Sequence, residues 1–96
     1  MSKEKKAIIK KPGEKMLRVT VHPDGDRIGT VRLEGDFFLY PEESVNDLES
    51  CLVHVKPEIS AIIEAVEQVT RTKNIEMVGL SPATIAEGIR MAMEVE

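Results

Sequence analysis

The hydrophobic periodicity of this 96-residue chain changes midway, and that change limits the fold more than any other feature. From Leu17 to Val21, apolar and polar residues alternate with a period of two, which is typical of a strand with one buried face. After Pro41, the apolar residues recur at helical spacing instead. Strands followed by helices predict an α+β domain, with a small antiparallel sheet packed on about three helices.

The strand pattern continues through a hairpin, because residues 23–26 form the turn sequence Pro-Asp-Gly-Asp. In the strand that follows, Val31 and Leu33 share one face, whereas Ile28 has the wrong parity for it. A bulge at Gly29 would correct that parity. The other face of the hairpin is expected to stay open to water or to a partner. It carries Arg18, Thr20, Arg32 and Glu34.

Three helices are predicted after the hairpin. Pro41-Glu42-Glu43 is expected to open the first, because proline and acidic residues suit a first turn. Ser81 is expected to cap the third, with Pro82 at its first position. The apolar stripes of the three helices are Val45, Leu48 and Leu52 with Cys51 on the flank; Ile59, Ile62, Ile63, Val66 and Val69; and Ile85, Ile89, Ala92 and Met93.

Charge and length limit the class of protein to which this chain can belong. Residues 1–15 have a net charge of +4, and residues 16–96 have a net charge of −8. The acidic charge of residues 16–96 does not suit a nucleic-acid-binding surface. Residues 1–10 are read as a basic N-terminal segment with a candidate strand at Ala7–Ile9, and Lys3–Lys6 as solvated and frayed. Residues 11–96 are read as one domain, with a further candidate strand within 75–79. A cytoplasmic protein that does not contact a membrane is expected.

Motifs for catalysis or metal binding are weak. Cys51 and His54 could touch, but they are too few for a structural zinc site. The sequence contains no glycine-rich phosphate loop between a strand and a helix. We therefore expect neither a metal site nor catalysis by this chain alone.

All three aromatic residues of the chain fall within residues 37–40. If the alternation of a strand continues here, Phe37 points toward the core, whereas Phe38 and Tyr40 point outward. Two outward aromatic rings suit an interface anchor, although helices could equally cover them. Gly35 would allow a close backbone approach.

These residues resemble a known family. The turn Lys11-Pro12-Gly13-Glu14-Lys15 leads into a strand, and Gly35-Asp36-Phe37-Phe38 stands between the hairpin and a helix like 41–55. This arrangement, with Gly79-Leu80-Ser81-Pro82 before the last helix, is similar to the accessory domain of lipoate–protein ligases. The resemblance covers about residues 8–95. Glu14 stands where that family commonly has a second glycine.

The resemblance implies a stand-alone, noncatalytic subunit that forms a heterodimer with a catalytic ligase subunit. ATP, magnesium and lipoate would bind in the partner's active site, where lipoyl-AMP forms. The lipoyl group would pass to acceptor domains of 2-oxoacid dehydrogenases or to the glycine cleavage H protein. The residues expected near the partner or the adenylate are Lys11, Gly13, Lys15, Gly35, Asp36, Phe38 and Tyr40.

Two other functions stay open from the residues. The accessory domain is similar in fold to sulfur-handling and iron–sulfur scaffold proteins, but a cluster needs several thiolates and the chain has one cysteine. A partner-binding module without a role in ligation is the other alternative.

Overall fold

The computed structural model describes residues 4–95. A three-stranded antiparallel sheet runs in the order β1-β2-β3, formed by β1 (Lys5–Ile9), β2 (Leu17–Asp24) and β3 (Arg27–Gly35). Three helices follow, α1 (Ser44–Cys51), α2 (Ile59–Thr72) and α3 (Pro82–Met93). The predicted α+β class is confirmed.

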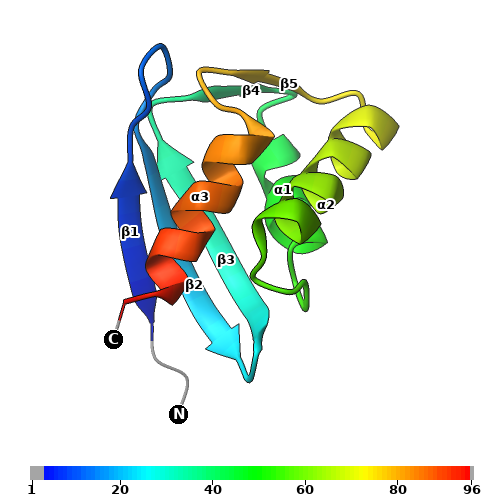
Figure 1. Cartoon of the computed structure of the whole chain (residues 1–96). Helices are drawn as coiled ribbons and strands as arrows, with labels where there is room; N and C mark the ends of the chain where they lie inside the picture. The colour runs from blue at the N-terminus through cyan, green and yellow to red at the C-terminus, as the bar shows by residue number, and fades with distance from the viewer. Residues whose placement is uncertain (1–3, 96) are drawn as a thin grey trace.

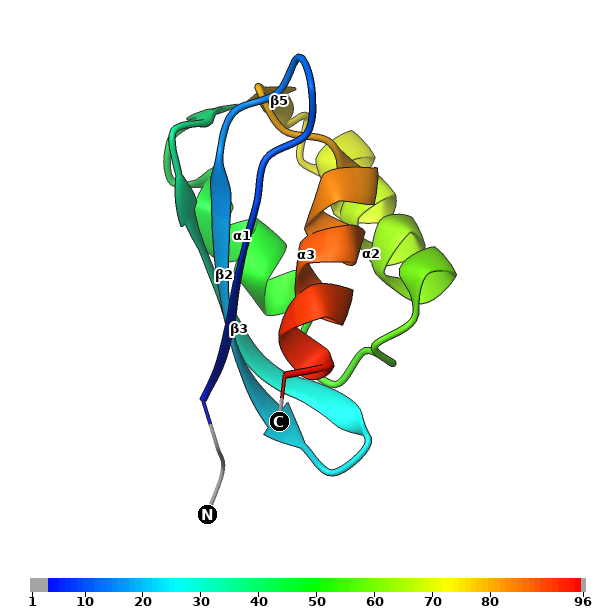
Figure 2. The same cartoon turned by 60° about the vertical axis from the view of Figure 1, so that its left-hand side comes forward.

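The helices cover one face of the sheet (Figures 1 and 2). Helix α3 packs on β1 and β2, α1 packs on β3, and α2 packs against both other helices. The alternating residues Leu17, Val19 and Val21 have no exposed surface, because they point into this core. No helix within residues 4–95 covers the opposite face of the sheet, as the alternation predicts.

The predicted bulge is confirmed. Thr30 pairs with His22, but the next pair is Ile28 with Pro23, which leaves Gly29 as an extra residue on β3. The shift returns Ile28 to the inner face, where its side chain is completely buried. A Cβ at residue 29 would overlap the carbonyl oxygen of His22, so the bulge requires glycine.

A second, two-stranded sheet was not predicted. β4 (Phe38–Tyr40) pairs antiparallel with β5 (Glu76–Val78), and we call this pair the β4–β5 ribbon. The candidate strand within residues 75–79 is therefore confirmed, but it joins Phe38–Tyr40 rather than the hairpin sheet. Figure 1 shows the ribbon at the top of the molecule, beside the loop that joins β1 to β2.

Three local predictions need correction. The first helix spans Ser44–Cys51 rather than about 41–55, because Tyr40 is still paired in β4 and residues 41–43 are needed to turn the chain. Ile59 is 40% exposed, since the buried stripe of α2 is narrower than its apolar residues suggest. Lys5 and Lys6 are in β1 rather than frayed. Lys3 lies outside the described residues.

Candidate functional site

The predicted turn at residues 11–15 is present. Gly13 has a φ of 81°, a left-handed conformation that favours glycine, and the Glu14 amide donates to the Lys11 carbonyl at 3.0 Å. Pro12, Gly13 and Lys15 are exposed. The sequence therefore determined this turn locally.

Helix α3 holds the turn in place. Lys11 Nζ lies 2.6 Å from Glu87 Oε2, and the hydroxyl of the buried Thr84 donates to the Glu14 carboxylate. Ser81 Oγ in turn donates to Thr84 Oγ1 at 3.0 Å and accepts from the Thr84 amide at 3.2 Å, which confirms Ser81 as the helix cap. Two charges of the turn are thus engaged within the chain, while the Lys15 side chain remains exposed. Nothing in the sequence pattern indicated this role of Glu14.

The turn also contacts the segments that carry the other predicted site residues. The Lys15 amide donates to the Gly79 carbonyl at 2.9 Å, next to β5, and the Asp36 amide donates to the Met16 carbonyl at 3.1 Å. A Cβ at residue 35 would overlap the Met16 carbonyl oxygen, so Gly35 is required for this close approach. The turn, Gly35-Asp36 and the ribbon therefore gather at one end of the molecule (Figure 1).

The outer face of the ribbon is exposed and apolar. Phe38 is 61% exposed and Tyr40 53%, so the helices do not cover them. Val78 pairs directly with Phe38 and is 41% exposed, while Leu39 on the inner face is buried. The sequence pattern missed Val78 as a site residue. Alternation within Glu76-Met77-Val78 was visible, but its partner strand was not.

A hollow of about 490 Å³ lies between the end of β3, β4 and the start of α1. Its lining is mostly apolar, with two glutamates. It is formed by Leu33, Glu34, Gly35, Phe37, Phe38, Leu39, Tyr40, Glu42 and Val45. We call it the β4–α1 hollow. The exposed rings of Phe38 and Tyr40 form part of its wall, and the hollow can accept an apolar group.

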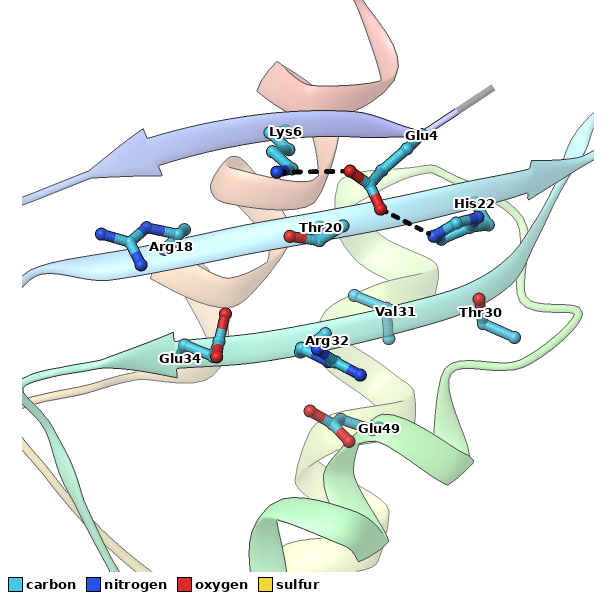
Figure 3. A pocket seen from close by; sticks show the side chains of 10 residues that line it. All are labelled: Glu4, Lys6, Arg18, Thr20, His22, Thr30, Val31, Arg32, Glu34 and Glu49. Carbon is cyan, nitrogen blue, oxygen red and sulfur yellow. Dashed lines mark ion pairs between the residues drawn. The ribbon is translucent and has the colours of Figure 1, made fainter. Parts of the chain in front are cut away.

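The open face of the β1-β2-β3 sheet has a different character (Figure 3). A hollow of about 370 Å³ there is lined almost wholly by charged residues and threonines. Glu4 lies 3.2 Å from Lys6 Nζ and 3.3 Å from His22 Nε2. The hydrogen bond from Lys6, together with its charge, lowers the pKa of Glu4 below the ordinary value of 4.5. Glu4 is thus held by two side chains of the same face.

Burial disfavours the thiolate form of Cys51, which is the form that acts as a nucleophile. Its thiol donates to the Leu48 carbonyl at 3.1 Å, and burial raises its pKa to about 11, with a smaller contribution from Asp47. His54 Nε2 instead faces Asp24 Oδ2 at 3.7 Å. Within residues 4–95, no group of three or more His, Cys, Asp or Glu side chains is arranged to hold a metal ion. In the same range, no helix is long and apolar enough to span a bilayer.

Known proteins give a consistent match, although no family model matches the chain. A 37-residue segment is 49% identical to lipoate-protein ligase A subunit 2 of Thermoplasma acidophilum, covering 38% of this chain and 39% of that relative. A solved chain from a structure of an archaeal lipoylation system, described as a bi-partite lipoate protein ligase and its E2 lipoyl domain from the same organism, aligns with a TM-score of 0.71. That alignment covers 94% of this chain and 96% of the other, at 29% identity.

The chain is similar to a subunit of a bipartite lipoate–protein ligase. The resemblance inferred from the Lys11–Lys15 turn and from residues 35–38 is therefore confirmed. With 29% identity over nearly the whole chain, the match extends to the sequence as well as to the fold.

Proposed function

We propose that this chain is the accessory, noncatalytic subunit of a bipartite lipoate–protein ligase, required with a catalytic subunit for ATP-dependent formation of lipoyl-AMP. The observation that carries the proposal is the structural match, which spans 94% of this chain and belongs to a bipartite ligase system. In this proposal the two subunits form a cytoplasmic heterodimer. ATP, magnesium and lipoate bind to the catalytic subunit, and lipoyl domains of 2-oxoacid dehydrogenases or the glycine cleavage H protein receive the product.

The end of the molecule that carries the predicted residues supports a docking role. Backbone hydrogen bonds and the α3 contacts hold the turn, Gly35-Asp36 and the ribbon in one arrangement before any partner binds. Such preorganisation lowers the entropic cost of association. Phe38 and Tyr40 would supply the apolar anchor, and Lys15 a positive charge beside it.

Lipoate-dependent exchange between ATP and pyrophosphate tests the proposal directly. The catalytic subunit of the same organism is assayed alone, with this chain, and with an equal amount of an unrelated protein. We expect exchange only with this chain, and no exchange with this chain alone. An exchange rate that does not respond to the chain would rule out the accessory role.

A substitution in the turn separates contact with the adenylate from contact with protein. If Lys15 lies near the adenylate, Lys15→Gln will raise the KM for ATP and leave the Kd between subunits unchanged. If it contacts only the partner subunit, the Kd will rise and the KM at saturating accessory subunit will not. Lys56→Gln is the matched control, because Lys56 is also exposed and lies outside the turn and ribbon.

A further inference from the structure

The β4–α1 hollow lies within an acidic stretch of the sequence. Residues 33–53 include six carboxylates and no Lys, Arg or His. Asp47 pairs with Lys73 at 3.6 Å, and Glu49 accepts the Leu33 amide at 2.8 Å. The remaining four are exposed: Glu34, Asp36, Glu42 and Glu43. Exposed carboxylates gathered in one stretch favour a partner of the opposite charge.

Apolar and acidic features coincide in this hollow. Glu34 and Glu42 line it together with Phe38, Tyr40 and apolar residues of β3, β4 and α1. Glu34 lies at the boundary between this hollow and the open sheet face, where Arg18 stands opposite it in the register of β2 and β3. Exposed aromatic rings beside an apolar hollow are typical of a surface that a protein partner covers.

We propose that the β4–α1 hollow receives an apolar side chain from a basic segment of the catalytic ligase subunit. The apolar group fills the hollow against Phe38 and Tyr40, and a neighbouring Lys or Arg of that segment pairs with Glu34 or Glu42. This inference rests on the proposed function and names the chemistry of its partner surface. A second copy of this chain does not fit, because a symmetric contact through this hollow would place the same carboxylates against each other.

Charge reversal tests this pairing. The variant Glu34→Lys/Glu42→Lys is compared with Glu64→Lys/Glu67→Lys, which makes the same change on two exposed residues of α2. The Kd for the catalytic subunit is measured at about 50 mM and about 500 mM NaCl, since salt screens exposed charges. We expect binding by the hollow variant to be weakened about 10-fold or more at low salt, by less at high salt, and by less than about 2-fold in the control.

Circular dichroism shows whether charge reversal disturbs folding. If it does, neutral substitutions at the same two residues test the proposal instead. Glu34→Gln/Glu42→Gln is expected to weaken binding about 3-fold at low salt and to make the Kd less sensitive to salt. If wild-type chain binds the catalytic subunit and restores exchange, but the neutral hollow pair binds as wild type does, the inference is wrong and the proposed function stands. If wild-type chain neither binds nor restores exchange, both fail.

Discussion

The open face of the three-stranded sheet and the outer face of the β4–β5 ribbon are built by the same rule and differ in what they present. In both, alternate residues point inward to the core and the others point outward. On the sheet the outward residues include Arg18, Thr20 and Arg32 (Figure 3). On the ribbon they include Phe38, Tyr40 and Val78.

The difference shows how a polar surface and a docking surface can be told apart. On the sheet face, Glu4 pairs with Lys6 and His22. The charged side chains of Arg18, Arg32 and Glu34 are exposed, and water can solvate them. The ribbon leaves two aromatic rings more than half exposed, which is unfavourable unless another surface covers them. Under the proposed function, we therefore expect the ribbon rather than the sheet face to meet the partner.

The largest expected effect is on stability, and it distinguishes the inner side of the ribbon from its outer side. Leu39→Ala removes a buried side chain and should lower the free energy of unfolding by about 2–4 kcal/mol. Phe38→Ala, one residue earlier but outward, should change it by less than about 0.5 kcal/mol. Urea unfolding followed by circular dichroism measures both. Equal destabilisation by the two variants would mean that the ribbon has no distinct outer face.

A smaller effect is expected on binding, where the two outer faces are compared. Phe38→Ala should weaken the affinity for the catalytic subunit by about 1–2 kcal/mol, because it removes an apolar anchor. Thr20→Ala on the sheet face should leave that affinity unchanged within about 0.3 kcal/mol. Isothermal titration calorimetry measures both. A loss with Thr20→Ala and none with Phe38→Ala would assign the partner to the sheet instead.

The smallest effect concerns the charges of the sheet face. Because Lys6 and His22 lower the pKa of Glu4 below 4.5, its carboxylate stabilises the fold above that pH, and the stabilisation is lost as pH falls through the lowered pKa. Glu4→Gln should therefore be slightly less stable than wild type at pH 7. The difference between the two urea midpoints should shrink as the pH falls through the lowered pKa of Glu4. A difference that does not shrink on acidification would show that the ion pairs do not account for it.

Several features were predictable from the sequence because their causes are local. Gly13 adopts a left-handed conformation that favours glycine. Ser81 caps the third helix by accepting from the amide of Thr84, three residues later. Ile28 breaks the alternation of its strand, which indicates a bulge. Of the site, the Lys11–Lys15 turn and the outward position of Phe38 and Tyr40 followed in the same way. The pairing of β4 with β5 did not, because 35 or more residues separate the two strands and each has only three residues.

The sequence by itself determined which side chains alternate, which turns form and where the third helix begins, since each depends on neighbours a few residues apart. It also showed the resemblance to lipoate–protein ligases through residues 11–15 and 35–38. Only the tertiary structure decided that Glu14 hydrogen bonds to Thr84, that Val78 joins Phe38 on one face, and that Glu34 and Glu42 border one hollow. These arrangements depend on contacts between distant segments, which form only when the helices pack on the sheet and bring those segments together.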